Sequence, residues 1–146
     1  IVKKNLMTTK SSGFTLIELL VVVAIIGILS AIGTISYTSY SSGAKTTAAK
    51  NVMQQIGLGQ VEYLSSYGSY YFNEEGGAEC SIDIAQGNGG SSNNIETNLF
   101  NGGDIITSET RYDMCIEGHG NGYKIKATNG NTQITLDHTG TWGDSF

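Results

Sequence analysis

A single carboxylate lies inside an apolar stretch close to the N-terminus of this chain of 146 residues. Between Phe14 and Tyr37 the only charged side chain is that of Glu18. Placing a carboxylate at the centre of a bilayer costs roughly 2.5–3.5 kcal/mol on insertion scales, and less near the edge. A simple apolar anchor has no need of such a group, so the pattern indicates that Glu18 takes part in function.

The stretch around Glu18 has the length and composition of a membrane-spanning helix. At a rise of about 1.5 Å per residue, the apolar run from Phe14 to Ile35 spans a hydrocarbon core of about 30 Å. Three lysines lie before the run, within residues 1–13, and none follows before Lys45. By the positive-inside tendency, the N-terminus is expected in the cytoplasm and the residues after Tyr37 on the opposite side of the membrane.

The residues on either side of Glu18 also resemble a known signal. A short basic leader ends in Gly13, and Phe-Thr-Leu-Ile-Glu-Leu-Leu follows at residues 14–20, with further apolar residues to Ile32. This pattern resembles the class III signal of type IV pilins and of type II secretion pseudopilins. The resemblance is close from Gly13 to about Tyr40 and faint beyond that residue.

The resemblance implies a processing site and an assembly residue. In that family a prepilin peptidase cuts after the glycine and methylates the new N-terminal phenylalanine, so the expected scissile bond joins Gly13 to Phe14. The glutamate four residues further on pairs with the N-terminus of a neighbouring subunit, which gives Glu18 the assembly role. Many members have a proline where this chain has Ile35, and this chain contains no proline, so the sequence leaves open whether the helix is kinked.

Two cysteines, Cys80 and Cys115, lie in the part of the chain that is expected to be exported. An even number of cysteines in an oxidising compartment predicts a disulfide bond. The two residues are too far apart in sequence to form a CxxC redox motif, and His119 and His138 do not complete a recognisable zinc spacing. We therefore predict a disulfide between Cys80 and Cys115 that ties a long connection to the sheet.

The residues that follow the apolar run predict a small head of mixed structure. Apolar residues at helical spacing continue to about residue 67, and Gly68 suits a left-handed helix cap. Residues 68–108 form a predicted connection rich in Gly, Asn and Ser, with a short strand at 81–85. Alternating residues in 109–146 then predict three or four antiparallel strands.

Two details of the predicted sheet concern its turns and its edge. Asn129-Gly130, flanked by alternating residues, predicts a two-residue hairpin turn in which both residues have positive φ. Residues 140–142 are expected to add an edge segment. The tyrosines around residues 67–71 are interpreted as packing residues rather than as a ligand platform.

Together these elements predict an α+β, pilin-like fold. A long N-terminal helix packs its outer half on a sheet of three or four antiparallel strands, and an αβ loop connects the two. The expected organisation is a prepilin leader at 1–13, a transmembrane and fibre-core arm at 14–40, and a globular head at 41–146.

Charge and motif content exclude several functional classes. Residues 1–13 carry three of the eight basic residues and no acidic one, so their removal leaves five basic against thirteen acidic residues, a side-chain charge of −8. Nucleic-acid binding is not expected of such an acidic chain. No catalytic constellation is recognisable, so an enzyme is not expected. Asp137 and Asp144 leave calcium as an alternative, but they lack the spaced oxygen ligands of a known loop, so no cofactor is predicted.

The leading interpretation is a pilin or minor pilin of a type IV pilus. Its expected partners are the prepilin peptidase, the inner-membrane assembly machinery and other pilins in a homo- or hetero-oligomeric fibre. The expected location is the bacterial inner membrane before assembly and the extracellular pilus afterwards. The alternatives are a pseudopilin in a periplasmic pseudopilus of a type II secretion system, and a pilus-associated adhesin or DNA-uptake pilin.

Overall fold

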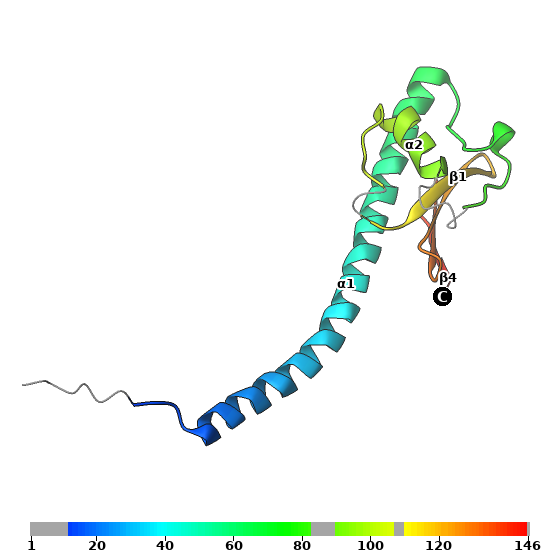
Figure 1. The fold of residues 1–146 in the computed structure, drawn as a ribbon. Helices are drawn as coiled ribbons and strands as arrows, with labels where there is room; N and C mark the ends of the chain where they lie inside the picture. The colour runs from blue at the N-terminus through cyan, green and yellow to red at the C-terminus, as the bar shows by residue number, and fades with distance from the viewer. Residues whose placement is uncertain (1–11, 83–89, 107–109, 146) are drawn as a thin grey trace, which may run out of the picture. The chain divides into compact units, whose positions relative to one another are not determined.

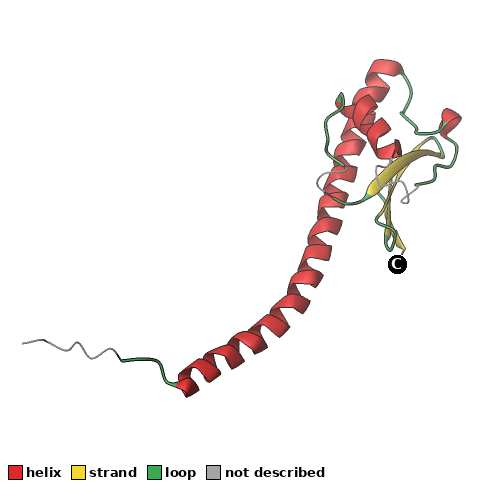
Figure 2. Cartoon of the chain, in the orientation of Figure 1, coloured by secondary structure: helices red, strands yellow, loops and turns green. Residues whose placement is uncertain are grey.

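The computed structural model describes residues 12–82, 90–106 and 110–145, and Figure 1 shows its fold. The chain divides into two compact units, Ile1–Tyr40 and Ser41–Phe146. Helix α1, Leu16–Tyr67, begins in the first unit and ends in the second. A four-stranded antiparallel sheet completes the second unit (Figure 2), so the predicted α+β fold is confirmed.

Residues 14–40 of the first unit are called the arm. The arm consists mainly of the apolar part of α1. Every described side chain from Ser12 to Tyr40 is exposed, including all of the apolar ones. Among the described residues, α1 is the one helix long and apolar enough to cross a membrane. It continues without interruption through Ile35, the position at which many proteins with this type of signal have a proline.

Polar side chains within the arm are satisfied by its own backbone. The hydroxyl of Ser30 donates to the carbonyl oxygen of Ile26, and that of Thr34 donates to the carbonyl oxygen of Ser30. Both donor–acceptor distances are 2.7 Å. An unsatisfied hydroxyl is costly in an apolar medium, and these bonds remove that cost. The arm therefore suits lipid or an apolar protein interior along this part of its length.

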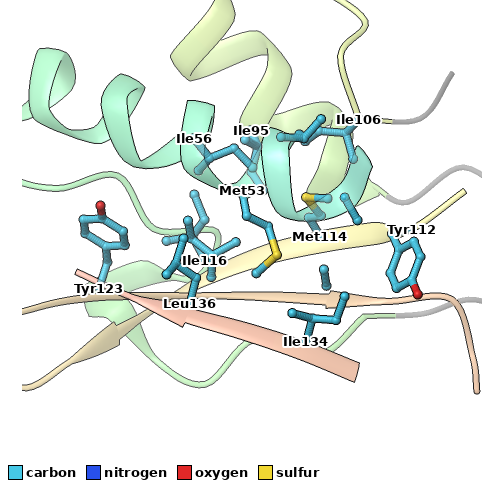
Figure 3. Close-up of a cluster of buried hydrophobic side chains, with 14 residues drawn as sticks. Met53, Ile56, Ile95, Ile106, Tyr112, Met114, Ile116, Tyr123, Ile134 and Leu136 are labelled. Carbon is cyan, nitrogen blue, oxygen red and sulfur yellow. The ribbon is translucent and has the colours of Figure 1, made fainter. Parts of the chain in front are cut away.

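The second unit, called the head, surrounds one hydrophobic core (Figure 3). Ala49, Val52, Met53 and Ile56 lie three or four residues apart on α1, so they share one face of the helix and are buried together. Strand residues complete the core from the facing side of the sheet: Met114, Ile116, Ile125, Ala127, Ile134 and Leu136. Burying each large side chain contributes about 1.5–3 kcal/mol, which offsets the low helix propensity of the glycines in this part of α1.

The sheet is a simple meander in the order β1-β2-β3-β4. The strands are β1 (Asp113–His119), β2 (Gly122–Thr128), β3 (Gln133–Asp137) and β4 (Trp142–Ser145). Ile116 lies opposite Ile125, which lies opposite Leu136, so the registers bring apolar residues onto one face. The predicted strand alternation is therefore confirmed.

The connection between β2 and β3 differs from the predicted two-residue turn. Thr128 pairs with Gln133, which leaves four residues between the strands. Gly130 has a φ of 96°, but Asn129 does not have positive φ. Instead, the side-chain oxygen of Asn129 accepts hydrogen bonds from the backbone N–H groups of Asn131 and Thr132. Asn129 thus acts through its side chain, as Asx turns do, and the prediction of positive φ at both positions is wrong.

The edge strand also extends beyond its predicted position. Gly140 has a φ of 87° and belongs to the turn before the strand, whereas β4 begins at Trp142 and runs to Ser145. Asp137 stabilises that turn because its carboxylate accepts hydrogen bonds from the backbone N–H groups of Thr139 and Thr141. The hydroxyl of Thr139 donates to the same carboxylate, and this bond, followed by that of the Thr141 N–H, holds the pKa of Asp137 below its ordinary value.

The segment predicted as a continuous connection at 68–108 contains a helix, α2 (Gly90–Phe100). Ser92, Ile95 and Glu96 are buried on one side of α2, and Leu99 packs partly against the core. The Gly, Ser and Asn residues have low helix propensity, so only tertiary packing of this face holds the helix. The short strand predicted at 81–85 is absent at Ser81 and Ile82, and its remaining residues lie outside the described part.

The buried side-chain amide of Gln60 ties the chain that follows α1 back to the helix. Gly68 has a φ of 75° and its N–H donates to the carbonyl oxygen of Leu64, so the predicted cap is confirmed. Gln60 is fully buried, and its side chain donates to the carbonyl oxygen of Tyr71 and accepts from the N–H of Tyr71. This reciprocal pair fixes the path of the chain where it leaves the helix.

Candidate functional site

The first turn of α1 contains a capping box built from Thr15 and Glu18. Thr15 directly precedes the helix, and its hydroxyl oxygen accepts a hydrogen bond of 3.3 Å from the N–H of Glu18. In return, Glu18 Oε2 accepts bonds from the Thr15 N–H at 2.8 Å and from the Thr15 hydroxyl at 2.7 Å. Such a reciprocal pair satisfies helix N–H groups that have no partner inside the helix.

The capping box places the carboxylate of Glu18 at the start of the helix rather than at the centre of the arm. A negative charge is favourable there because the helix dipole is positive at the N-terminus. Both of these bonds end on Oε2, and among the hydrogen bonds of the described residues none ends on Oε1. A carboxylate has acceptor sites for further donors, and the cap therefore leaves Glu18 able to bind a second group.

Gly13 and Phe14 precede the helix in a segment without regular secondary structure. A side chain added at Gly13 would meet nothing within 4 Å, so no packing within the described chain requires glycine there. Phe14 is 90% exposed. The bond between these two residues is thus placed where another protein can reach it, while the helix begins two residues later.

The predicted disulfide is present between Cys80 and Cys115, with a distance of 6.2 Å between their Cα atoms. Cys115 lies on β1 between the core residues Met114 and Ile116, so it points to the opposite face of the sheet. Both cysteines are buried. The bond therefore fixes the segment around Cys80 across the face of the sheet that α1 does not cover.

An ion pair lies beside the disulfide. Glu117 Oε2 is 2.7 Å from Lys126 Nζ and also accepts the backbone N–H of Cys80 at 3.2 Å. Glu79 adds a second carboxylate 3.3 Å from Lys126 Nζ. Burial lowers the pKa of Lys126, but the hydrogen bonds and charges of Glu117 and Glu79 outweigh burial, so the pKa is raised above its ordinary value.

The two aspartates considered as calcium ligands do not come together. Asp144 lies opposite Ile134, three residues along β3 from Asp137, or about 10 Å at strand spacing. Asp137 is engaged in the turn described above, whereas Asp144 lies 3.5 Å from Lys50 Nζ. Within the described residues, no group of three or more metal-ligating side chains gathers, and these two carboxylates do not lie side by side.

Sequence reasoning identified Glu18 but missed its partner Thr15. The signal was present, because a threonine followed three residues later by glutamate at the start of an apolar run is the pattern of a capping box. The ion pair between Glu117 and Lys126 was also missed. It joins residues nine apart in sequence through the register of two strands, which composition does not reveal.

Comparison with known proteins addresses the N-terminal part of the chain. Residues 8–34 match the family model of the prokaryotic N-terminal methylation motif. This motif is the signature of prepilin-type proteins, the type IV pilins and pseudopilins, so the resemblance seen at Gly13 to Glu18 is confirmed. The match does not reach the head. No curated protein and no solved structure matches the chain.

The motif carries general consequences for processing and assembly. It points to a structural subunit, to processing by a prepilin peptidase and to assembly with other pilins. Together with the exposed apolar helix, it fits insertion into a membrane before assembly.

Replacing Cys80 by serine is expected to loosen the head. The bond closes a loop with a sequence separation of 35 residues, which corresponds to about 3–4 kcal/mol of unfolding free energy in the chain-entropy model. Limited proteolysis of the full chain in detergent should show new cleavage between residues 73 and 103. The double variant Cys80→Ser/Cys115→Ser controls for the free thiol, and proteolysis equal to that of the wild type would show that the bond has no structural importance.

Alkaline pH is expected to weaken the head through Lys126. Because its folded-state pKa is raised, the ion pair stabilises the head fully below the ordinary lysine pKa of 10.5, and this contribution is lost as pH rises through the folded-state value. Glu117→Gln should lower the unfolding free energy by about 1–3 kcal/mol at neutral pH. It should also flatten the alkaline loss, measured by thermal unfolding in detergent. The exposed partner provides the control, since Glu79→Gln should have little effect.

Proposed function

We propose that this chain, which carries the methylation motif of prepilin-type proteins, is a structural subunit of a type IV pilus. The observation that carries the proposal is the position of that motif, residues 8–34, on an arm whose apolar side chains are exposed. Such a surface is stable only in lipid or against other apolar helices. The apolar surface of the arm is covered by lipid after membrane insertion, and by other arms after assembly into a fibre.

Processing between Gly13 and Phe14 prepares the arm for assembly. Cleavage removes the basic leader, leaves the whole helix α1 intact and creates an α-amine on Phe14. The accessible, non-helical position of this bond supports the assignment. The peptidase then methylates that amine, which keeps its positive charge.

Glu18 provides the charge that the new N-terminus meets during assembly. No basic side chain occurs between Phe14 and Ala44, so an ionised Glu18 inside a bundle of arms has no cationic side chain of this segment to pair with. The amine of Phe14 on a neighbouring subunit supplies the missing charge. The capping box supports this role because it holds Glu18 in place and leaves Oε1 for the neighbour.

A pseudopilin of a type II secretion system is the second candidate, since the same motif occurs in that class. Its arm would assemble by the same physics in a periplasmic pseudopilus. A role as adhesin or DNA-uptake pilin has less support, because a mature side-chain charge of −8 opposes binding to phosphate backbones.

Deletion of the gene separates the two leading candidates. Electron microscopy of the cell surface and an inventory of secreted proteins should be made on the same cultures. Loss of surface fibres with normal secretion is the expected outcome. Normal fibres with loss of secreted enzymes would instead identify a pseudopilin.

Processing is expected to yield a mature chain that begins at Phe14 with one added methyl group. Intact-mass measurement of the protein purified from cells checks this directly. Gly13→Ala is the matched variant, because no contact in the chain requires glycine there and folding should be unaffected while cleavage is lost. A mature species that retains Lys10 or begins after Thr15 would contradict the assignment.

Substitutions at Glu18 and Thr15 separate the charge of the carboxylate from its capping role. Glu18→Gln keeps an acceptor for the capping box but removes the charge, and it should reduce incorporation into fibres at least tenfold, as Glu18→Ala should. Thr15→Val keeps the charge and loses the hydroxyl cap, at a cost of about 1 kcal/mol to the helix end.

Fibre incorporation is measured in cells that also make the wild-type subunit. Thr15→Val should therefore assemble better than Glu18→Gln. If Glu18→Gln entered fibres like the wild type while Thr15→Val failed, Glu18 would act only as a cap and the charge pairing would be wrong.

A further inference from the structure

A small polar cleft lies in the head where helices α1 and α2 both end. Helix α2 lies beside the C-terminal turns of α1 (Figure 1), and their close approach occurs at Gly59, whose Cβ would lie 3.3 Å from the ring of Phe100. The cleft has a volume of about 160 Å³. Its polar and aromatic lining residues are Glu62, Tyr63, Ser66, Tyr67, Asn98 and Asn101.

The tyrosines give the cleft an aromatic wall. The ring centroids of Tyr63 and Tyr67 are 4.4 Å apart at an interplanar angle of 31°, and Tyr71 meets Tyr63 edge-on at 5.8 Å. Tyr67 is nevertheless 71% exposed. The ring of Tyr67 is thus held by Tyr63 and still offers aromatic surface to a ligand. Because Tyr67 is exposed, packing in the core does not explain its position.

The electrostatics of the cleft favour positive charge. The C-terminal ends of helices carry partial negative charge, and neither α1 nor α2 has a basic residue in its last turn to compensate for it. Glu62 adds a carboxylate, and it takes part in none of the ion pairs seen among the described residues. The lining residues include no lysine, arginine or histidine.

Size and chemistry then limit the ligand. A volume of about 160 Å³ is below the roughly 300–1,000 Å³ typical of cofactor and drug-sized sites, so a single small group is accommodated. Anions are disfavoured by the charge. A metal ion would find a single carboxylate, that of Glu62, beside neutral oxygens, and no group of three or more His, Cys, Asp or Glu side chains gathers among the described residues. An organic cation, in contrast, gains from an aromatic face, a carboxylate and two helix ends at once.

We propose that this cleft binds an organic ammonium group. The same chemistry is offered by a quaternary ammonium such as a choline head group and by the lysine side chain of another protein chain. Tyr67 supplies the aromatic face and Glu62 the countercharge, while Tyr63 holds Tyr67 in position. The inference concerns the head alone and does not depend on the assembly role of the arm.

The test uses the full chain in a maltoside detergent, at constant ionic strength, observed by NMR with labelled tyrosines. Choline chloride is compared with 3,3-dimethyl-1-butanol, which has nearly the same shape but no charge. Saturable shifts at Tyr63 and Tyr67 with choline, and at least fivefold weaker binding of the alcohol, are the expected results. Equal binding of the two probes, or no shift at these tyrosines with any cationic probe, would overturn the proposal.

Variants and a second probe identify the contacts and the source of the cation. Tyr67→Leu and Glu62→Gln should each weaken binding about two- to fivefold, which is the range of an exposed cation–π contact, whereas Tyr67→Phe should retain most of it. N-acetyl-lysine methylamide and its norleucine counterpart form the other arm. Tighter binding of the lysine probe supports a protein chain as the source, and tighter binding of choline supports a head group. Unchanged affinity in both Tyr67→Leu and Glu62→Gln would refute the assignment.

Discussion

The exposed apolar surface of the arm is the physical constraint on which the rest of this molecule depends. From Phe14 to Ile35, large apolar side chains are roughly half exposed or more, and burial of such surface is the main favourable term in folding and association. Such a surface requires apolar surroundings, which lipid or the apolar faces of other helices can provide. The internal hydrogen bonds of Ser30 and Thr34 suit both media, since they leave no hydroxyl that requires water.

Glu18 becomes tolerable in this setting because it lies in the first helical turn. The capping box with Thr15 satisfies part of the carboxylate within the same chain, and the helix dipole favours its charge. A carboxylate deeper in the arm would lack both compensations. The same capping box that reduces the cost of the charge occupies only Oε2 of the carboxylate, so the cap leaves acceptor capacity on Glu18 for a further donor.

The head has a small core and few strands, and several kinds of contact stabilise it. One face of α1, around Met53 and Ile56, packs on the inner face of the sheet. At the outer edge of β1, Asn73 bonds both the N–H and the carbonyl of Ile116, and Ser92 accepts the N–H of Met114. These side chains occupy backbone groups of an edge strand that otherwise invite pairing with another chain. The disulfide fixes the covering segment in place.

The amino-acid sequence by itself determined the features that depend on local pattern and composition. The apolar helix, the methylation motif, the strand alternation and the pairing of the two cysteines are of this kind, because each follows from neighbouring residues or from an even count. Tertiary structure alone decided helix α2, the role of Asn129 and the pair of Glu117 with Lys126. Helix α2 is composed largely of poor helix formers and exists because Ile95 and Ser92 are buried against other elements, while the ion pair requires the register of β1 and β2. Such contacts join residues whose proximity is created only by folding, so no local signal announces them.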